Sequence, residues 1–181
     1  MKRPIAHMLP CSAGPVTLRR LAVADLAAFQ AYRQDPELGR YQGWSPMSDV
    51  EATAFLSEMS SAPLFLPGFW SQVGISEISD PSLIGDIGLF LAEDSRHVEV
   101  GFTLQRQSQG RGIASVAVRE AIRLAFEQTG ADRVLGITDA RNAASVRLLE
   151  RLGMRRTETK DAVFRGESCV EYVYALERGA G

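Results

Sequence analysis

Cysteine and histidine are scarce in this chain of 181 residues, which contains two of each. Cys11 and Cys169 are too few for a disulfide scaffold, so we expect both to be free thiols. The histidines stand far apart, at His7 and His97, and no Cys/His cluster has the spacing of a zinc site. We therefore expect neither a disulfide framework nor a metal.

An excess of charge of one sign is also lacking. The chain has 20 Lys+Arg and 22 Asp+Glu, which gives a formal net charge of −2. General nucleic-acid binders usually present a basic face. This balance argues against a nucleic-acid partner, although it still allows a local basic pocket.

Long apolar runs are absent as well. No window approaches the ~18 apolar residues of a membrane span. The basic start at Lys2 and Arg3 resembles a signal peptide, but the apolar stretch behind it is interrupted by His7 and closed by Pro10. That stretch is shorter than the roughly 7–15 residues of such a signal. We expect a cytoplasmic protein with no membrane partner.

What is present is an ordinary globular composition, with 45% hydrophobic and 23% charged residues. The length suits one domain. Three prolines, at Pro4, Pro10 and Pro15, predict an irregular lead-in over residues 1–15. A single domain is expected to follow over residues 16–178.

Hydrophobic spacing and turn residues predict four helices and seven strands. Ser48 and Glu51 match a capping box at one helix start, and Gly153 marks a helix end. The helices are expected at 24–33, 48–59, 113–127 and 142–152, and the strands at 16–20, 69–77, 83–91, 96–104, 133–138, 155–164 and 169–176. Because helices and strands alternate only once or twice, the fold class is α+β or mixed α/β, rather than a doubly wound sheet.

The most informative segment is 107–114, which follows a strand and opens a long helix. Gly110 and Gly112 let the backbone turn sharply and approach a ligand, and the first amides of the helix favour an anion such as phosphate. The glycine spacing alone fits a bare strand-to-helix turn equally well. A P-loop run is missing, and Ser115 stands where a dinucleotide fingerprint needs its third glycine, so both of those phosphate motifs are disfavoured.

This segment resembles the signature of the GNAT superfamily of acyl-CoA-dependent N-acyltransferases, Gln/Arg-x-x-Gly-x-Gly/Ala, through Gln107, Gly110 and Gly112. Further blocks resemble the RimJ/RimL-type branch of that family, in the expected order. These blocks are residues 83–89, 99–104 and 171–176, together with Asn142, Ser145 and the run Leu152-Gly153-Met154.

The resemblance implies a GNAT-like twisted, mostly antiparallel sheet of seven strands with flanking helices. It also implies a splay between the two central strands, 96–104 and 133–138, in which the co-substrate acetyl-CoA lies. The backbone of Phe102, Thr103 and Leu104 would pair with pantetheine. The cofactor-binding set is completed by Gln107 of the signature, by the amides around the pyrophosphate at Gln109, Gly110, Arg111, Gly112, Ile113 and Ala114, and by Asn142 and Ser145.

Catalysis needs a base for the acceptor ammonium and a proton for the departing thiolate. Glu99 is the first candidate for the base, since partial burial would raise its pKa. A plain solvent-facing strand glutamate is the alternative, and Glu171 and Asp86 are further candidates. Many members of the resembled family have a tyrosine as the acid where this chain has Leu149, so Ser145 is the candidate acid here.

Several assignments stay open. Asn142 also fits a plain helix N-cap, and Arg106, Arg111 or Arg147 would meet the adenosine phosphates. Trp44 fits either an acceptor pocket or the core. Trp70 is also outside the signature. Phe65, Leu66 and Phe69 fit the same pocket or a homodimer contact.

The leading interpretation is an acetyl-CoA-dependent N-acetyltransferase whose acceptor is a primary amine, specifically a protein or peptide N-terminal α-amine. Three alternatives remain. They are a small-molecule amine acetyltransferase, a non-catalytic acyl-CoA-binding module and an unrelated nucleotide-phosphate binder.

Overall fold

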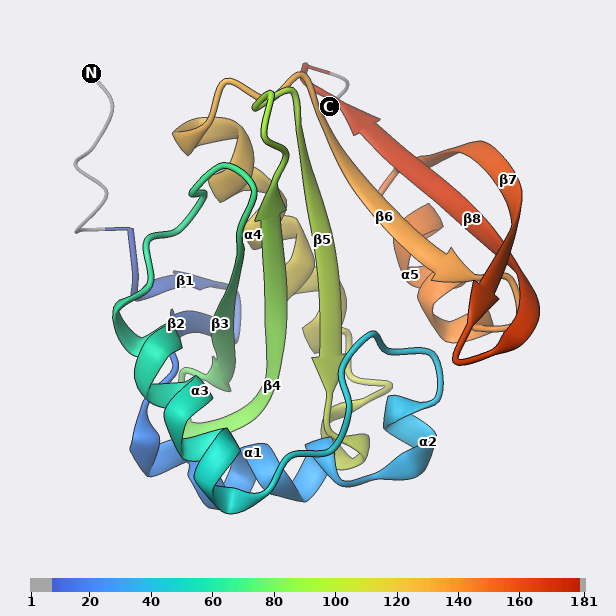
Figure 1. Ribbon diagram of the computed structural model, residues 1–181. Coiled ribbons are helices and arrows are strands. Elements are labelled where there is room, and N and C mark those ends of the chain that lie inside the picture. Colours follow the sequence, from blue (N-terminus) through green and yellow to red (C-terminus); the bar gives the residue numbers. More distant parts are fainter. Residues whose placement is uncertain (1–7, 180–181) are drawn as a thin grey trace.

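The computed structural model describes residues 8–179, which form one eight-stranded sheet (Figure 1). The strand order is β1-β2-β3-β4-β5-β6-β8-β7, and β5 and β6 are the parallel pair in an otherwise antiparallel sheet. The strands are β1 (Cys11–Ala13), β2 (Val16–Arg20), β3 (Trp70–Glu77), β4 (Asp80–Leu91), β5 (His97–Leu104), β6 (Arg133–Asp139), β7 (Arg155–Phe164) and β8 (Glu167–Glu177).

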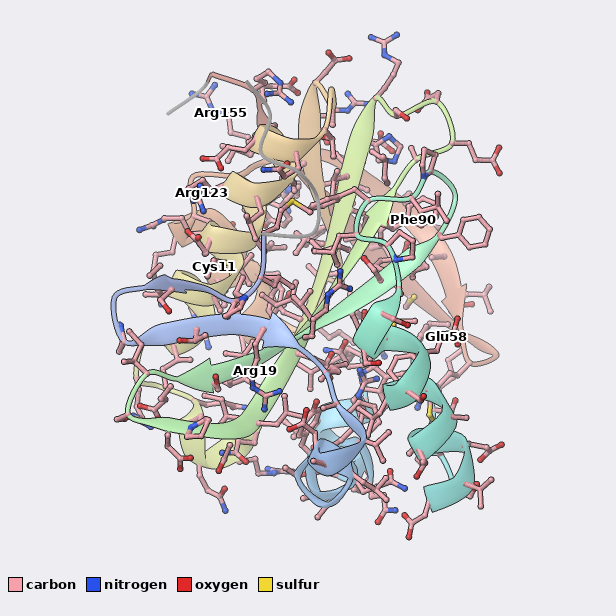
Figure 2. The ribbon with its side chains drawn as sticks, turned by 90° about the vertical axis from the view of Figure 1, so that its left-hand side faces the viewer. Cys11, Arg19, Glu58, Phe90, Arg123 and Arg155 are labelled. Carbon is pink, nitrogen blue, oxygen red and sulfur yellow. The ribbon has the colours of Figure 1, made fainter. Side chains whose placement is uncertain are left out.

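Helices cover both faces of this sheet. Figure 1 shows α1, α2 and α3 in front of the sheet and α4 and α5 behind it, and the turned view of Figure 2 places α3 and α4 on opposite sides. The helical segments are η2 (Val23–Asp25), α1 (Leu26–Arg33), α2 (Pro36–Gly39), α3 (Asp49–Ser61), η3 (Arg106–Ser108), α4 (Ile113–Gln128) and α5 (Ala143–Arg151).

The expected fold class is confirmed, since the fold is α+β with a mostly antiparallel sheet. All of the expected helices and strands are present, with ends shifted by a few residues. The capping box at α3 is confirmed, because the Ser48 hydroxyl accepts from the Glu51 amide at 3.3 Å and the Glu51 carboxylate accepts from the Ser48 amide at 2.8 Å.

Two short elements differ from the sequence-based expectation. The sheet has eight strands rather than seven, because residues 11–13, which we expected to be irregular, form β1 against β2. Residues 1–7 of the expected lead-in lie outside the described residues. The segment after Asp35 forms α2 rather than a loop, with the Asp35 carboxylate accepting from the Glu37 amide at 3.0 Å.

Two apolar layers hold the sheet. The larger one lies between the sheet and α4 and α5, and includes Val98 and Val100 of β5. The smaller one packs α1 and α3 on the front face around Phe29, Tyr32 and Leu56. No helix within residues 8–179 is long and apolar enough to cross a membrane.

The sheet opens between β5 and β6. Their ladder has only three pairs, from His97 opposite Arg133 to Glu99 opposite Leu135, although β5 continues to Leu104 and β6 to Asp139. Figure 1 shows the two strands diverging beyond this ladder. The expected splay is therefore present, and it exposes the backbone edges of both strands.

Candidate active site

A cleft of about 640 Å³ lies at the splay. Its walls come from α2, the end of β5, the first turn of α4 and one side of α5 along its length. The residues lining it are Glu37, Leu38, Tyr41, Gln42, Phe102, Thr103, Leu104, Arg106, Ser108, Gln109, Gly110, Gly112, Ile113, Ala114, Ser115, Asn142, Ala144, Ser145, Arg147, Leu148 and Arg151. Ten of the residues that we expected to bind the cofactor are in this set.

The backbone of β5 presents alternate peptides to the cleft. The Ala92 amide donates to the His97 carbonyl at 3.0 Å, and the Gln105 amide donates to the Ile84 carbonyl at 2.8 Å. In an antiparallel ladder, residues two apart direct their backbone N–H and C=O groups to the same neighbouring strand. Every second residue from His97 to Gln105 therefore bonds β4, and the residues between them face away from β4. The peptides of Phe102 and Leu104 consequently face the splay.

Thr103 departs from our expectation for the same reason. Its peptide is directed to β4, where it is paired with Asp86. The Thr103 hydroxyl instead accepts a hydrogen bond from the Trp44 indole Nε1 at 3.2 Å. Thr103 therefore contributes a side chain to the front of the site, and its backbone is not free to bind a ligand.

Two glutamine side chains occupy the carbonyls that face the splay. The Gln42 amide Nε2 donates to the Phe102 carbonyl at 3.3 Å, and the Gln109 amide Nε2 donates to the Leu104 carbonyl at 2.9 Å. Both bonds come from segments at the cleft wall. They show that these carbonyls are accessible to an amide donor.

The start of α4 is built to receive an anion. Gly110 and Gly112 have φ values of 74° and 77°, and a Cβ on either would meet no described heavy atom within 4 Å. Among residues 8–179, no side chain caps this helix, and its first turn contains no acidic residue. The amides of Ile113, Ala114 and Ser115 are left without intrahelical partners. The residues present therefore fit a phosphate.

Two signature residues lie outside the cleft. Gln107 is exposed within η3 and does not line it. Arg111 points away, because its guanidinium forms two 2.8 Å hydrogen bonds with the Glu77 carboxylate at the end of β3. Gln107 and the Arg111 side chain therefore do not line the cleft, which leaves Arg111 out of reach of the adenosine phosphates in this arrangement. The role expected of the Arg111 backbone amide at the pyrophosphate stays a prediction.

Two of the three candidate arginines line the cleft. Arg106 is held by Asp35, whose carboxylate accepts from Arg106 Nη2 at 2.8 Å. This hydrogen bonding lowers the pKa of Asp35 to about 2. Arg147 lies on the exposed side of α5 at the other wall. Arg106 and Arg147 thus place positive charge on both sides of the cleft.

The start of α5 contributes the second expected block. The Asn142 side-chain oxygen accepts from the Ser145 amide at 3.2 Å, so Asn142 is an N-cap, and both residues also line the cleft. Ser145 is half-buried. Leu149 is buried in the core and does not line the cleft.

Glu99 lies on the front face of β5, close to the end of the ladder with β6. It is half-buried. Desolvation by burial raises the pKa of Glu99; Lys160 opposes this rise and Glu171 adds to it. Glu171 itself lies 3.8 Å from the Lys160 ammonium. Glu99 has the burial expected of a base, whereas Glu171 is part of an ion pair.

Asp86 is a structural group. It is 1% exposed. It accepts from Arg33 at 2.8 and 2.9 Å, from the Tyr32 hydroxyl at 2.5 Å and from Gln72 at 3.2 Å. With its oxygens so engaged beneath α1, Asp86 is not available as the base that we considered in third place.

Residues 40–45 form a loop against the end of β5, and this loop contains Trp44, which we expected either in an acceptor pocket or in the core. Trp44 is half-buried, with the Arg33 guanidinium 4.6 Å from its ring centroid. Arg165, in the β7–β8 turn, donates to the Trp44 carbonyl at 2.7 Å and to the Gln42 carbonyl at 3.2 Å. This loop is therefore fixed by residues that are distant in sequence, and Trp44 is its one residue that the sequence suggested for the site.

The Acetyltransferase (GNAT) domain family matches residues 16–155. The chain therefore belongs to the GNAT acetyltransferase family. Among curated relatives, the uncharacterized N-acetyltransferase p20 of Bacillus licheniformis is 27% identical over 142 residues, which cover 78% of this chain and 79% of p20. The uncharacterized N-acetyltransferase YoaA of Bacillus subtilis is 27% identical over 140 residues, or 77% of this chain and 78% of YoaA.

Solved structures share the fold. An acetyltransferase of the GNAT family from Bacillus anthracis superposes with a TM-score of 0.80 at 20% identity, covering 92% of this chain and 96% of that one. RimL, the ribosomal L7/L12 α-N-protein acetyltransferase in complex with coenzyme A, gives a TM-score of 0.78 at 15% identity, covering 95% and 99%. These structures show that the chain has the fold of the family that its residues 16–155 match.

Proposed function

We propose that the chain transfers an acetyl group from acetyl-CoA to a primary amine, with the donor bound in the 640 Å³ cleft. The observation that carries this proposal is the start of α4, where two glycines with positive φ and an uncapped first turn adjoin the splay. Two neighbours by fold support it, since their structures contain coenzyme A and acetyl-CoA. Pantetheine amides would replace Gln42 and Gln109 at the Phe102 and Leu104 carbonyls.

The acceptor that we favour is a protein or peptide N-terminal α-amine. RimL, which has this fold, is described as an α-N-protein acetyltransferase. An α-amine has an ordinary pKa of about 7.7–8.0, so at neutral pH most of it is protonated. The acceptor therefore has to lose a proton before it can attack. Our candidate to accept it, directly or through water, is Glu99, which is half-buried on the front face beside the splay.

The neutral nitrogen attacks the thioester carbonyl, the C–N bond forms and the C–S bond breaks. Ser145 lines the cleft and is our candidate to donate a proton to the departing thiolate. The second proton that the nitrogen loses as the amide forms restores the Ser145 hydroxyl, and Glu99 releases the first proton to solvent. Acetyl-CoA supplies the activated acyl group, and the protein supplies binding, orientation and the two proton transfers.

Three measurements test this function. Calorimetry should show binding of acetyl-CoA and competition by CoA, but not by ATP at a similar concentration. Thiol release should then require an added amine, and Ser145→Ala should lower kcat more than it raises KM for acetyl-CoA, by about 10²–10⁴-fold. Binding without turnover across a wide amine panel would identify an acyl-CoA-binding module instead. A kcat within a factor of about two of the wild type would exclude Ser145 as the acid.

A further inference from the structure

An aromatic pair stands beside Glu99 on the front face of the sheet. Trp70 of β3 is the direct cross-strand partner of Phe90 of β4, and their ring centroids are 5.4 Å apart. Phe90 is in turn paired with Glu99 of β5. Directly paired residues project to the same face, so one row across three strands carries two aromatic rings and a carboxylate.

The aromatic pair is accessible. Trp70 is 48% exposed, and Phe90 is half-buried. Figure 2 shows Phe90 projecting on the side of the sheet that carries α3, and in Figure 1 α1 and α3 lie over the lower part of this face only. Contiguous exposed apolar surface of this kind marks a binding site more often than isolated apolar residues do.

The pair borders an open floor next to the splay. The Trp70 ring and the Gln72 side chain lie over Gly88, with Trp70 Cζ3 at 3.1 Å and Gln72 Oε1 at 2.6 Å from the position that a Cβ on Gly88 would take. Gly101 is paired with Gly88, and a Cβ on Gly101 would meet no described heavy atom within 4 Å. Neighbouring strands lie about 4.8 Å apart. The ring is therefore one strand away from an unfilled position on β5, and Glu99 is two residues along that strand.

We propose that Trp70 and Phe90 bind the apolar part of the acceptor, so that the preferred substrates are primary amines with an aromatic or large aliphatic group close to the nitrogen. This proposal rests on the proposed function above. An amine seated over Gly101 is beside Glu99, whose carboxylate complements the ammonium form. Its apolar substituent then reaches the Trp70 ring across one strand spacing, about 4.8 Å.

An amine with an adjacent apolar group can belong to a peptide N-terminus or to a free small molecule, and each of these needs its own assay. A peptide with an N-terminal Phe presents the ring next to its α-amine, and phenethylamine presents the same pair without a peptide. The matched acceptors are the same peptide with an N-terminal Ser, and ethylamine. For each pair, the quantity measured is the ratio of kcat/KM values for the aromatic and the non-aromatic acceptor.

The wild type should favour the aromatic member of at least one pair, and that pair identifies the source. Trp70→Ala and Phe90→Ala should each lower the ratio by about 10-fold or more, the range that loss of an apolar contact produces. Trp70→Phe should retain most of it, because an aromatic ring remains. Ile78→Ala is the matched control, since Ile78 is 60% exposed at the turn of the same hairpin, and it should leave the ratio unchanged.

The outcomes separate this proposal from the proposed function. Acetylation with the same ratio in wild type, Trp70→Ala and Phe90→Ala would overturn the acceptor assignment and leave the acetyltransferase activity standing. Absence of acetyl transfer to every amine would instead overturn the proposed function. If the alanine variants change the oligomeric state in light scattering and leave the ratio unchanged, the pair is a contact between copies of the chain, which also overturns the assignment.

Discussion

Leu149 of α5 packs directly on Gly136 of β6. Its Cδ2 atom is 2.6 Å from the position that a Cβ on Gly136 would occupy, and the side chain is 1% exposed. The missing side chain on β6 is therefore what lets α5 approach the sheet. The position that matches the family's tyrosine is a core contact in this chain.

Enlarging either partner should destabilise the fold. Gly136→Ala and Leu149→Tyr each add atoms to a filled contact, so we expect each to lower the free energy of unfolding by about 1–3 kcal/mol. Gly130→Ala is the control, because a Cβ there meets no described heavy atom within 4 Å. Urea unfolding measures all three. A Leu149→Tyr variant as stable as the wild type would show that this contact adapts to the larger ring.

The buried pair of Arg33 and Asp86 should be far more sensitive than a surface pair. The two side chains are 3% and 2% exposed, and Nη2 of Arg33 is 2.8 Å from the Asp86 carboxylate. Asp86→Asn leaves a buried guanidinium without its counter-charge, so we expect a loss of about 3–5 kcal/mol in unfolding free energy.

The exposed pair Arg96–Asp132, at 3.1 Å, provides the matched control for this substitution. Asp132→Asn should change the unfolding free energy by about 1 kcal/mol or less. Denaturant titrations of both variants at one pH make the comparison. Equal losses would contradict a specific structural role for Asp86.

Much of the fold could be predicted because its strands and long helices have strong local patterns. Val98 and Val100 alternate with polar or small residues along β5, and Ser48 with Glu51 marks the start of α3. β1 and α2 were missed because three or four residues are too few to show a period of 2 or 3.6 residues.

The site was less predictable because pairing and distant contacts decide it. The direction of the Thr103 peptide depends on the register between β4 and β5, which no local pattern specifies. Arg111 turns away from the cleft because Glu77, at the end of another strand, binds it. Trp44 is held by Thr103, Arg33 and Arg165, which lie on other elements. By contrast, Gly110 and Gly112 were predictable, since a left-handed turn selects glycine wherever it occurs.

Gly112 and Gly153 separate backbone strain from ligand binding. Both have positive φ, 77° and 82°, and neither has a described heavy atom within 4 Å of a Cβ position. Alanine at either should therefore cost a similar 1–2 kcal/mol or so of stability. Only Gly112→Ala places a methyl group at the proposed phosphate site, so it alone should weaken acetyl-CoA binding, by about 10–100-fold in calorimetry. Equal affinity in the two variants would exclude the start of α4 as the phosphate site.

Glu99→Gln should remove the base and its pH dependence together. If Glu99 accepts the proton of the acceptor, kcat rises with pH as the carboxyl ionises, at a pKa that burial raises above 4.5. The variant should lose about 10²–10⁴-fold in kcat and lack this acidic limb. Glu171→Gln is the comparison, because Glu171 is the second carboxylate on this face. If kcat of Glu99→Gln keeps the same acidic limb in its pH dependence as the wild type, a group other than Glu99 produces that limb.

The same substitution should stabilise the protein at neutral pH. Because the pKa of Glu99 is raised on folding, the native state binds more protons than the unfolded state between pH 4.5 and the raised value. Stability contributed by the protonated carboxyl is therefore lost as the pH rises through that window. The unfolding free energy of Glu99→Gln should match the wild type below about pH 4 and exceed it above the window. A Glu99→Gln variant less stable than the wild type at pH 7 would mean that the ionised carboxylate contributes favourable contacts that outweigh its desolvation.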